Sequence, residues 1–256
     1  MLCNQSNVFK KYSVVNDLKK HQLKYFCNVN LRGSNLNLIV QLMLYLFKIK
    51  NLYYLISIIC LYVILSISYN YFLMSEALLS QLYEGVLNRT QIQETIAFVK
   101  KWEWGFILLN VLIVFIRISF VAICLYLGLF FFSNQSNPFK TTFNIALKAE
   151  IIFVVYTIVR LLWFGVINIP EAPEEMQVTP LSLMHFFDPH FIEPWLIYPL
   201  STLNIFEGLY FLMLSALMAA TVQIKFRKAF ELVFVSYGTG LLLLMVTQMF
   251  LILNNT

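Results

Sequence analysis

Long apolar runs separated by short polar stretches dominate the chain after residue 51. Five of these runs are long enough for transmembrane helices, since a helix needs about 20 apolar residues to cross a bilayer. They are residues 52–73, 104–132, 147–169, 203–224 and 230–253. The pattern therefore predicts an all-α protein, a polytopic bundle of five transmembrane helices.

The beginning of the chain differs from the rest. Residues 1–35 are basic, carry the single acid Asp17 and contain no apolar core as long as that of a signal peptide. Apolar positions between Tyr12 and Phe26 recur loosely at helical spacing. This fits either a helix lying on an anionic membrane surface or a solvated cytoplasmic tail.

A shorter apolar run, residues 38–47, lies just before the first long one. Ten residues rise only about 15 Å as a helix, against about 30 Å of hydrocarbon, so we predict an interfacial or re-entrant helix. The expected organisation is a basic cytoplasmic segment, residues 1–51, followed by one transmembrane domain, residues 52–256.

Composition supports a membrane protein, because 60% of the 256 residues are hydrophobic and only 12% are charged, too few to give a soluble domain its polar surface. The four cysteines fall in the leading segment or inside predicted spans, which argues against a disulfide framework. The basic residues lie beside apolar runs rather than in a patch with stacking aromatics, so no nucleic-acid partner is expected.

The positions of Lys and Arg predict the orientation. Thirteen lie in segments predicted inside, among them Lys140 and Lys148, whereas three lie in segments predicted outside. Because short cytoplasmic segments carry the excess of positive residues, we expect the amino terminus inside and the carboxyl terminus outside. The outside connection between the third and fourth spans is acidic, with five acids and no Lys or Arg.

Two arginines, Arg117 and Arg160, fall near the middle of their predicted spans, while the acids are expected at other depths. Glu150 should lie near the inner surface and Glu207 near the outer surface. A charge at membrane depth is costly, so each arginine should face protein, water or a ligand rather than lipid.

Three arrangements would satisfy these arginines. In the first, Arg160 reaches Glu207 while Arg117 snorkels or bonds backbone carbonyls. In the second, a partner subunit supplies the missing acids. In the third, an anion or lipid headgroup binds in a cavity. Whichever holds, we predict that Arg117, Glu150, Arg160 and Glu207 form a set of partner- or lipid-binding residues.

The acidic outer loop holds a weaker candidate, a metal site. His185, Asp188, His190 and Glu193 are ligand-type side chains within nine residues, and zinc needs three or four converging ligands. However, the spacing matches no helical pair motif and Pro189 ends any helix after Asp188, so the alternative is that they simply line the loop. Without a Gly-rich phosphate loop or a nucleophile-elbow serine, no catalytic residue and no cofactor are predicted.

Glycines open the middle of the last predicted span, in Tyr237-Gly-Thr-Gly240. Small residues at such positions let two helices approach closely in a membrane. We therefore expect close helix packing at this point of the bundle.

Loosely spaced motifs recur across the last three predicted spans. They are Asn137-Pro-Phe-Lys140, Pro180-Leu-Ser-Leu-Met184, Tyr198-Pro-Leu200, Leu203-Asn-Ile-Phe-Glu207 and Lys225-Phe-Arg-Lys-Ala229. Over roughly residues 104–253 the chain resembles the bacterial branch of the Yip family, five-span membrane proteins whose eukaryotic members bind small GTPases of vesicle traffic. The acidic-aromatic-glycine signature of those eukaryotic members is missing, so GTPase binding is not carried over. The resemblance implies a five-helix integral membrane protein with an inside amino terminus and no known catalytic machinery.

Polar residues at membrane depth without a reaction centre predict a non-enzymatic scaffold or accessory subunit. Its partners would be the lipid bilayer and other membrane-protein subunits. The expected location is a bacterial inner membrane, because the residue usage fits an AT-rich genome and the branch that the chain resembles is bacterial. One alternative is a transporter or channel component with an anion path lined by Arg117 and Arg160. Another is a membrane metalloenzyme that uses the outer loop.

Overall fold

The computed structural model describes residues 50–83, 87–132, 139–170, 175, 179–187 and 192–255. Helices make up nearly all of these residues, and no β-strand occurs among them. Five helical segments are long and apolar enough to cross a membrane, which confirms the predicted all-α, five-span fold and supports an integral membrane protein. Residues 1–49, which include the predicted basic segment and the short helix at 38–47, lie outside the described residues.

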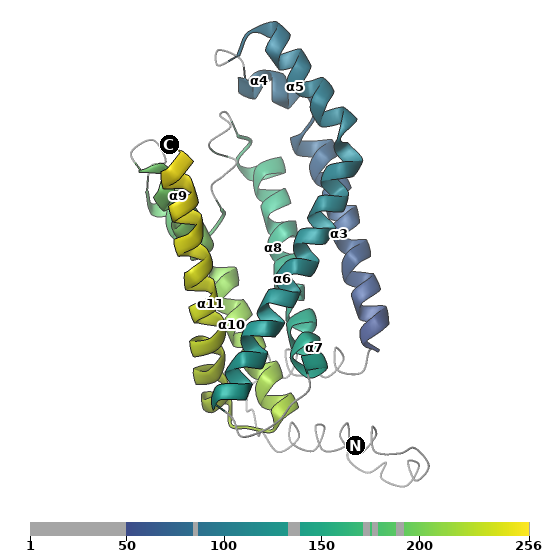
Figure 1. Ribbon diagram of the computed structural model, residues 1–256. Coiled ribbons are helices and arrows are strands. Elements are labelled where there is room, and N and C mark those ends of the chain that lie inside the picture. The colour runs from purple at the N-terminus through teal and green to yellow at the C-terminus, as the bar shows by residue number, and fades with distance from the viewer. Residues whose placement is uncertain are drawn as a thin grey trace.

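The spans are formed by seven helical elements. The first two are α3 (Asn51–Leu73) and α6 (Glu103–Phe132). The third consists of α7 (Phe139–Ala149), α8 (Ile151–Leu162) and the π-helix η1 (Trp163–Ile167), which follow one another as one helical segment. The last two are α10 (Ile205–Val222) and α11 (Phe226–Asn255). Each span follows the previous one in the opposite direction (Figure 1).

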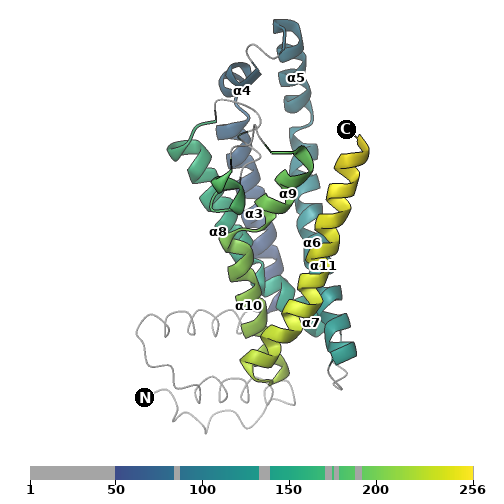
Figure 2. The same cartoon turned by 90° about the vertical axis from the view of Figure 1, so that its left-hand side faces the viewer.

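In the described part of the chain, four shorter helices lie beyond or between the spans. They are α4 (Glu76–Tyr83), α5 (Arg89–Lys101), the 3-10 helix η3 (Leu183–Phe186) and α9 (Pro194–Thr202). The helices α4 and α5 stand beyond the bundle at the end where α11 finishes, and α5 runs nearly in line with α6 (Figures 1 and 2). The helix α9 packs along α11.

The span α10 forms the centre of the bundle. In the most apolar part of α10, 61% of the residues are buried inside the protein, against 22–28% in the corresponding parts of the other four spans. It packs against α7, α8 and α11, and the bundle closes through α6 and α3. Its 18 residues rise about 27 Å, slightly less than the hydrocarbon thickness. The start of α10 therefore lies inside the bundle, and α9 extends above it (Figure 2).

A seam of close contact joins α6 to α11. A Cβ atom added to Gly240 would lie 2.6 Å from Cys124 Sγ, and one added to Gly128 would lie 2.5 Å from Ser236 Cβ. Larger side chains would push the two helices apart, so glycine is required at both positions. The close packing predicted for the Gly238–Gly240 segment is confirmed at Gly240, whereas Gly238 has only ordinary contact with Phe211.

The start of α3, the end of α6 with the start of α7, and the connection from α10 to α11 all lie at one end of the bundle (Figure 1). We call it the basic end, because its described charged residues include Lys50, Lys140, Lys225, Arg227 and Lys228. Assignment of this end to the inside of the membrane stays a prediction. One residue used for it is placed differently: Lys148 is a buried residue of α7 rather than a loop residue, because that helix begins at Phe139.

Candidate functional site

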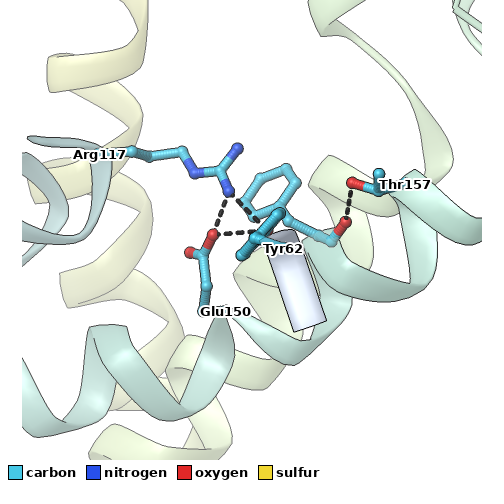
Figure 3. Close-up of polar contacts among 5 residues, drawn as sticks. Tyr62, Arg117, Glu150 and Thr157 are labelled. Atoms are coloured by element: carbon cyan, nitrogen blue, oxygen red, sulfur yellow. Dashed lines mark hydrogen bonds and ion pairs between the residues drawn. The ribbon is translucent and has the colours of Figure 1, made fainter. Parts of the chain in front are cut away.

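Three side chains from three different spans meet in the interior of the bundle (Figure 3). Arg117 of α6 forms an ion pair with Glu150, which occupies the turn between α7 and α8. Nη2 of Arg117 also donates a hydrogen bond of 2.9 Å to the hydroxyl of Tyr62 on α3. That hydroxyl in turn donates to Oε1 of Glu150 at 2.9 Å. The three groups therefore form a closed triangle of polar contacts.

The triangle lies in apolar surroundings. Glu150 is fully buried and Tyr62 is 4% exposed. The guanidinium carbon of Arg117 lies 4.1 Å from the centroid of the Phe153 ring, an arrangement that adds a cation–π attraction to the ion pair. In such a site a charge is tolerated only with its partner present, because each ion has lost its hydration.

This pairing corrects the expectation that the deep arginines have no acid at their own depth. The apolar run that begins at residue 147 predicts a position near the inner surface for Glu150. The helix begins at Phe139, so Glu150 lies 11 residues into the span, about 16 Å along its axis. Arg117 lies 14 residues into α6, so the two charges share one level and Arg117 does not depend on backbone carbonyls.

A second pair lies between the last two spans. The hydroxyl of Tyr237 on α11 donates to Oε1 of Glu207 on α10 at 2.7 Å, and both residues are buried. Tyr237 lies 11 residues after the start of α11 and 18 before its end. Glu207 is therefore an interior residue, not one near the outer surface, because α10 starts inside the bundle.

Tyr210 connects the two pairs. Its ring lies 4.6 Å from that of Phe153 and 5.6 Å from that of Tyr237, and the residue is fully buried. We use the name interior polar cluster for Tyr62, Arg117, Glu150, Glu207, Tyr210 and Tyr237. Within the described part of the chain, Glu150 Oε2, Arg117 Nε and the hydroxyl of Tyr210 make no hydrogen bond.

The fourth predicted residue, Arg160, lies outside this cluster. It follows Glu150 by ten residues, toward the far end of α8, and is half-buried. Its guanidinium carbon lies 5.9 Å from the ring centroid of Tyr69 and 5.8 Å from that of Phe164. Glu207 contacts Tyr237 instead of Arg160, so the expected reach of Arg160 to Glu207 is wrong.

The structure describes only part of the predicted metal site. The exposed His185 of η3 lies against Trp163, with 5.8 Å between ring centroids, and Glu193 directly precedes α9. Asp188 and His190 lie outside the described residues. Among the residues that are described, no three His, Cys, Asp or Glu side chains gather as metal ligands. The metal site therefore stays a prediction.

Three tyrosines of the interior polar cluster, Tyr62, Tyr210 and Tyr237, were not among the predicted site residues. Helical spacing in the sequence indicates which face of α3 carries Tyr62. It lies on the same face as the buried Ile58 and Ser66, four residues before and after it. A polar atom on a buried face needs a partner, and this need could have identified Tyr62.

Comparison with protein-family models, with curated proteins and with solved structures finds no match. The resemblance to the Yip family therefore stays a prediction.

Proposed function

We propose that this protein is a non-enzymatic scaffold or accessory subunit that binds other membrane proteins. The observation that carries the proposal is a helical hairpin, α4 with α5, that stands beyond the five spans (Figures 1 and 2). We call it the α4–α5 arm. A rigid projection from a membrane bundle offers a contact surface that the lipid does not cover.

The α4–α5 arm has its own stabilising contacts. Asn88 caps α5, accepting a hydrogen bond of 2.9 Å from the Gln91 backbone N–H, while the Gln91 side chain accepts one of 3.1 Å from the Asn88 N–H. Lys100 pairs with Glu76 across the hairpin, and Leu79 is buried between the helices. Reciprocal capping fixes the start of a helix, so the arm has a defined shape with which to meet a partner.

The exposed residues of the arm suit a partner in water. Arg89, Thr90, Gln91, Gln93 and Glu94 are all exposed on α5, and such side chains are not accommodated in hydrocarbon. Exposed aromatic residues follow where α5 meets α6, at Trp102 and Trp104, and Trp is typical of membrane–water interfaces. The arm would therefore begin at the membrane surface and reach into the aqueous phase.

The interior polar cluster fits the same role. Its polar contacts join α3, α6 and the α7–α8 turn in one set and α10 and α11 in another. Polar side chains bonded across helices help to hold bundles together in membranes. Its predicted contact with a partner or with lipid remains part of the proposal. So does location in a bacterial inner membrane, which the resemblance to Yip-like proteins supports.

Site-specific photo-crosslinking in native membranes tests this role. A photoreactive residue at Gln93, exposed on the arm, should give one discrete protein adduct. The same residue at Leu243, which is 61% exposed on the lipid-facing side of α11, should give lipid adducts. Lipid adducts alone at both positions would contradict a protein-binding arm.

One observation favours a second candidate, a component of an ion transporter. The helix that contains Glu207 begins inside the bundle after the break between α9 and α10. Discontinuous helices with charged residues at mid-depth are typical of ion sites in transporters. The cluster carries two carboxyl groups and one guanidinium, so a cation suits it better than the anion first expected. Cation flux into reconstituted vesicles, absent from empty ones, would support transport over scaffolding.

A further inference from the structure

The charges of the interior polar cluster do not balance. Arg117 is committed to Glu150 through their ion pair. Glu207 lies near this pair, because its partner Tyr237 packs against Tyr210, and Tyr210 packs against Phe153, the ring that Arg117 contacts. The one described side-chain hydrogen bond of Glu207, however, comes from the neutral hydroxyl of Tyr237. If both carboxyl groups were ionised, the cluster would hold one negative charge without a counterion at membrane depth. Such a charge is unfavourable in an apolar site.

Among the described residues, the neighbours of Glu207 offer no second cation. The ionisable groups that face it are Tyr210 on its own helix, Tyr237 on α11, and the Arg117–Glu150 pair on α6 and the α7–α8 turn. Of these only Arg117 is positive, and the negative Glu150 lies nearer to it. Tyr62, whose hydroxyl is hydrogen-bonded to both members of that pair, is neutral. Glu207 must therefore be neutralised in another way.

The start of α10 does not neutralise Glu207 either, although the first backbone N–H groups of a helix favour a nearby anion. Three of the first four N–H groups are used elsewhere. The N–H of Ile205 donates to Leu181 O at 3.3 Å, that of Glu207 to Asn204 Oδ1 at 2.8 Å, and that of Gly208 to Asn204 O at 3.3 Å. Neutral acceptors thus take the donors that would otherwise solvate a carboxylate.

We propose that Glu207 is a proton-binding site of the membrane interior. Its carboxylate takes up one proton and becomes a neutral carboxylic acid, while the Tyr237 hydroxyl continues to donate to Oε1. Glu150 stays ionised beside Arg117. The two acids of the cluster therefore differ in charge, and the bound proton balances the cluster. This site is independent of the α4–α5 arm, so failure of the arm to bind a partner would leave it unaffected.

Infrared spectroscopy of the protein in lipid nanodiscs at neutral pH tests the site. A protonated carboxyl group absorbs at a frequency separate from that of a carboxylate. The wild-type spectrum should show a carboxylic acid band that Glu207→Gln removes. Glu150→Gln should leave this band in place, and Glu231→Gln, at an exposed acid paired with Arg227, should change only carboxylate bands. Loss of only carboxylate bands in Glu207→Gln would overturn the proposal.

Sodium provides the competing outcome. If the carboxylic acid band disappears when sodium chloride replaces choline chloride at constant pH, the site takes Na⁺ in preference to a proton, and the proposal is wrong as stated. Persistence of the band in sodium chloride supports it.

A measurement of stability supplies a second readout. Glutamine resembles a protonated glutamate in shape and charge, so Glu207→Gln should unfold at nearly the same denaturant concentration as the wild type. Glu150→Gln leaves Arg117 without its counterion and should unfold at a clearly lower concentration. Equal losses in the two variants would mean that both acids are ionised, and this would contradict a proton on Glu207.

Discussion

Glu150 and Glu207 have similar surroundings in most respects. Each lies near the middle of the bundle, is buried, and accepts a hydrogen bond from a tyrosine of a neighbouring span, Tyr62 in one case and Tyr237 in the other. The difference is Arg117, which pairs with Glu150 alone. Two glutamate side chains in the same bundle therefore occupy different electrostatic environments.

The comparison shows how a membrane bundle accommodates acidic residues. At Glu150 a cation from another helix neutralises the acid. The two become mutually dependent, because Glu150 alone would be an unpaired buried charge and the half-buried Arg117 alone would be an unpaired charge at membrane depth. At Glu207 a neutral hydroxyl is the partner, so the side chain depends far less on any one neighbour. Variants of the two sites should therefore differ sharply in stability.

Replacement of Arg117 should have the largest effect. Arg117→Met leaves Glu150, which is fully buried, without a counterion, and removal of one partner from a buried pair costs about 3–5 kcal/mol. The free energy of unfolding, measured by titration with sodium dodecyl sulfate in mixed micelles, should fall by this amount.

Two variants control that experiment. Arg227→Met breaks the exposed pair with Glu231 on α11 and should change stability by no more than about 0.5 kcal/mol, because exposed pairs contribute little. The double variant Arg117→Met/Glu150→Gln leaves no buried charge and should recover part of the loss. Similar losses for Arg117→Met and Arg227→Met would show that the interior ion pair does not form.

The seam between α6 and α11 should give the next largest effect. Gly240 lies one helical turn after Tyr237, so the seam sets the distance of the Glu207 site from α6. In Gly240→Ala the new Cβ would lie 2.6 Å from Cys124 Sγ, and overpacking of this kind costs about 1–3 kcal/mol. The same detergent titration should show the loss.

Removal of the opposing atom tests the cause. Cys124→Ala should rescue part of the loss in Gly240→Ala, because the atom that clashes is then absent. Gly208→Ala is the matched control, since nothing lies within 4 Å of the added Cβ there. That change should be neutral or stabilising by up to about 1 kcal/mol, as alanine favours helix. If Cys124→Ala gave no rescue, the seam would not be the source of the loss.

The spans could be predicted from sequence because each is a run of apolar residues longer than a bilayer requires. Their ends could not be placed as well, and the error mattered most for Glu150. The segment before it, Phe139–Ala149, contains polar residues such as Lys140 and Asn144, and it therefore does not resemble a membrane span. It is nevertheless helical, with one face, including Ile145 and Ala146, buried against other helices.

The pairing of the site residues depends on information that a single sequence lacks. Arg117 and Glu150 could be recognised as costly charges, but the choice of partner depends on the rotation and tilt of each helix. These follow from contacts such as the glycine seam and the burial of α10, which involve residues far apart in the chain. The tyrosines were missed for a related reason, because their hydroxyl groups become informative only when the buried face of each helix is known.

Substitution of the two tyrosines should sharpen the comparison further. Tyr62→Phe removes contacts with both Arg117 and Glu150, and hydrogen bonds to charged groups contribute about 1.5–3 kcal/mol. Tyr237→Phe removes one hydrogen bond to Glu207. If Glu207 is protonated, this bond has a neutral acceptor, and its removal should lower the free energy of unfolding by about 1 kcal/mol. Equal losses in a detergent titration would indicate that Glu207 carries the same charge as Glu150.

The smallest effect is expected at the cap of α10. Asn204→Ala removes the acceptor for the Glu207 N–H, and loss of such a cap typically costs about 1 kcal/mol. Hydrogen exchange at the Glu207 amide should accelerate, whereas Asn204→Asp should retain the cap. Asn88→Ala makes the same change at α5 in the α4–α5 arm, so its loss should appear as faster exchange in the arm alone. The same variant also tests the proton on Glu207. The freed N–H in Asn204→Ala exposes Glu207 to the positive end of α10, which favours the ionised carboxylate over the neutral acid. The carboxylic acid band should therefore weaken in Asn204→Ala and stay unchanged in Asn88→Ala; an unchanged band in both would mean that the cap does not control the proton on Glu207.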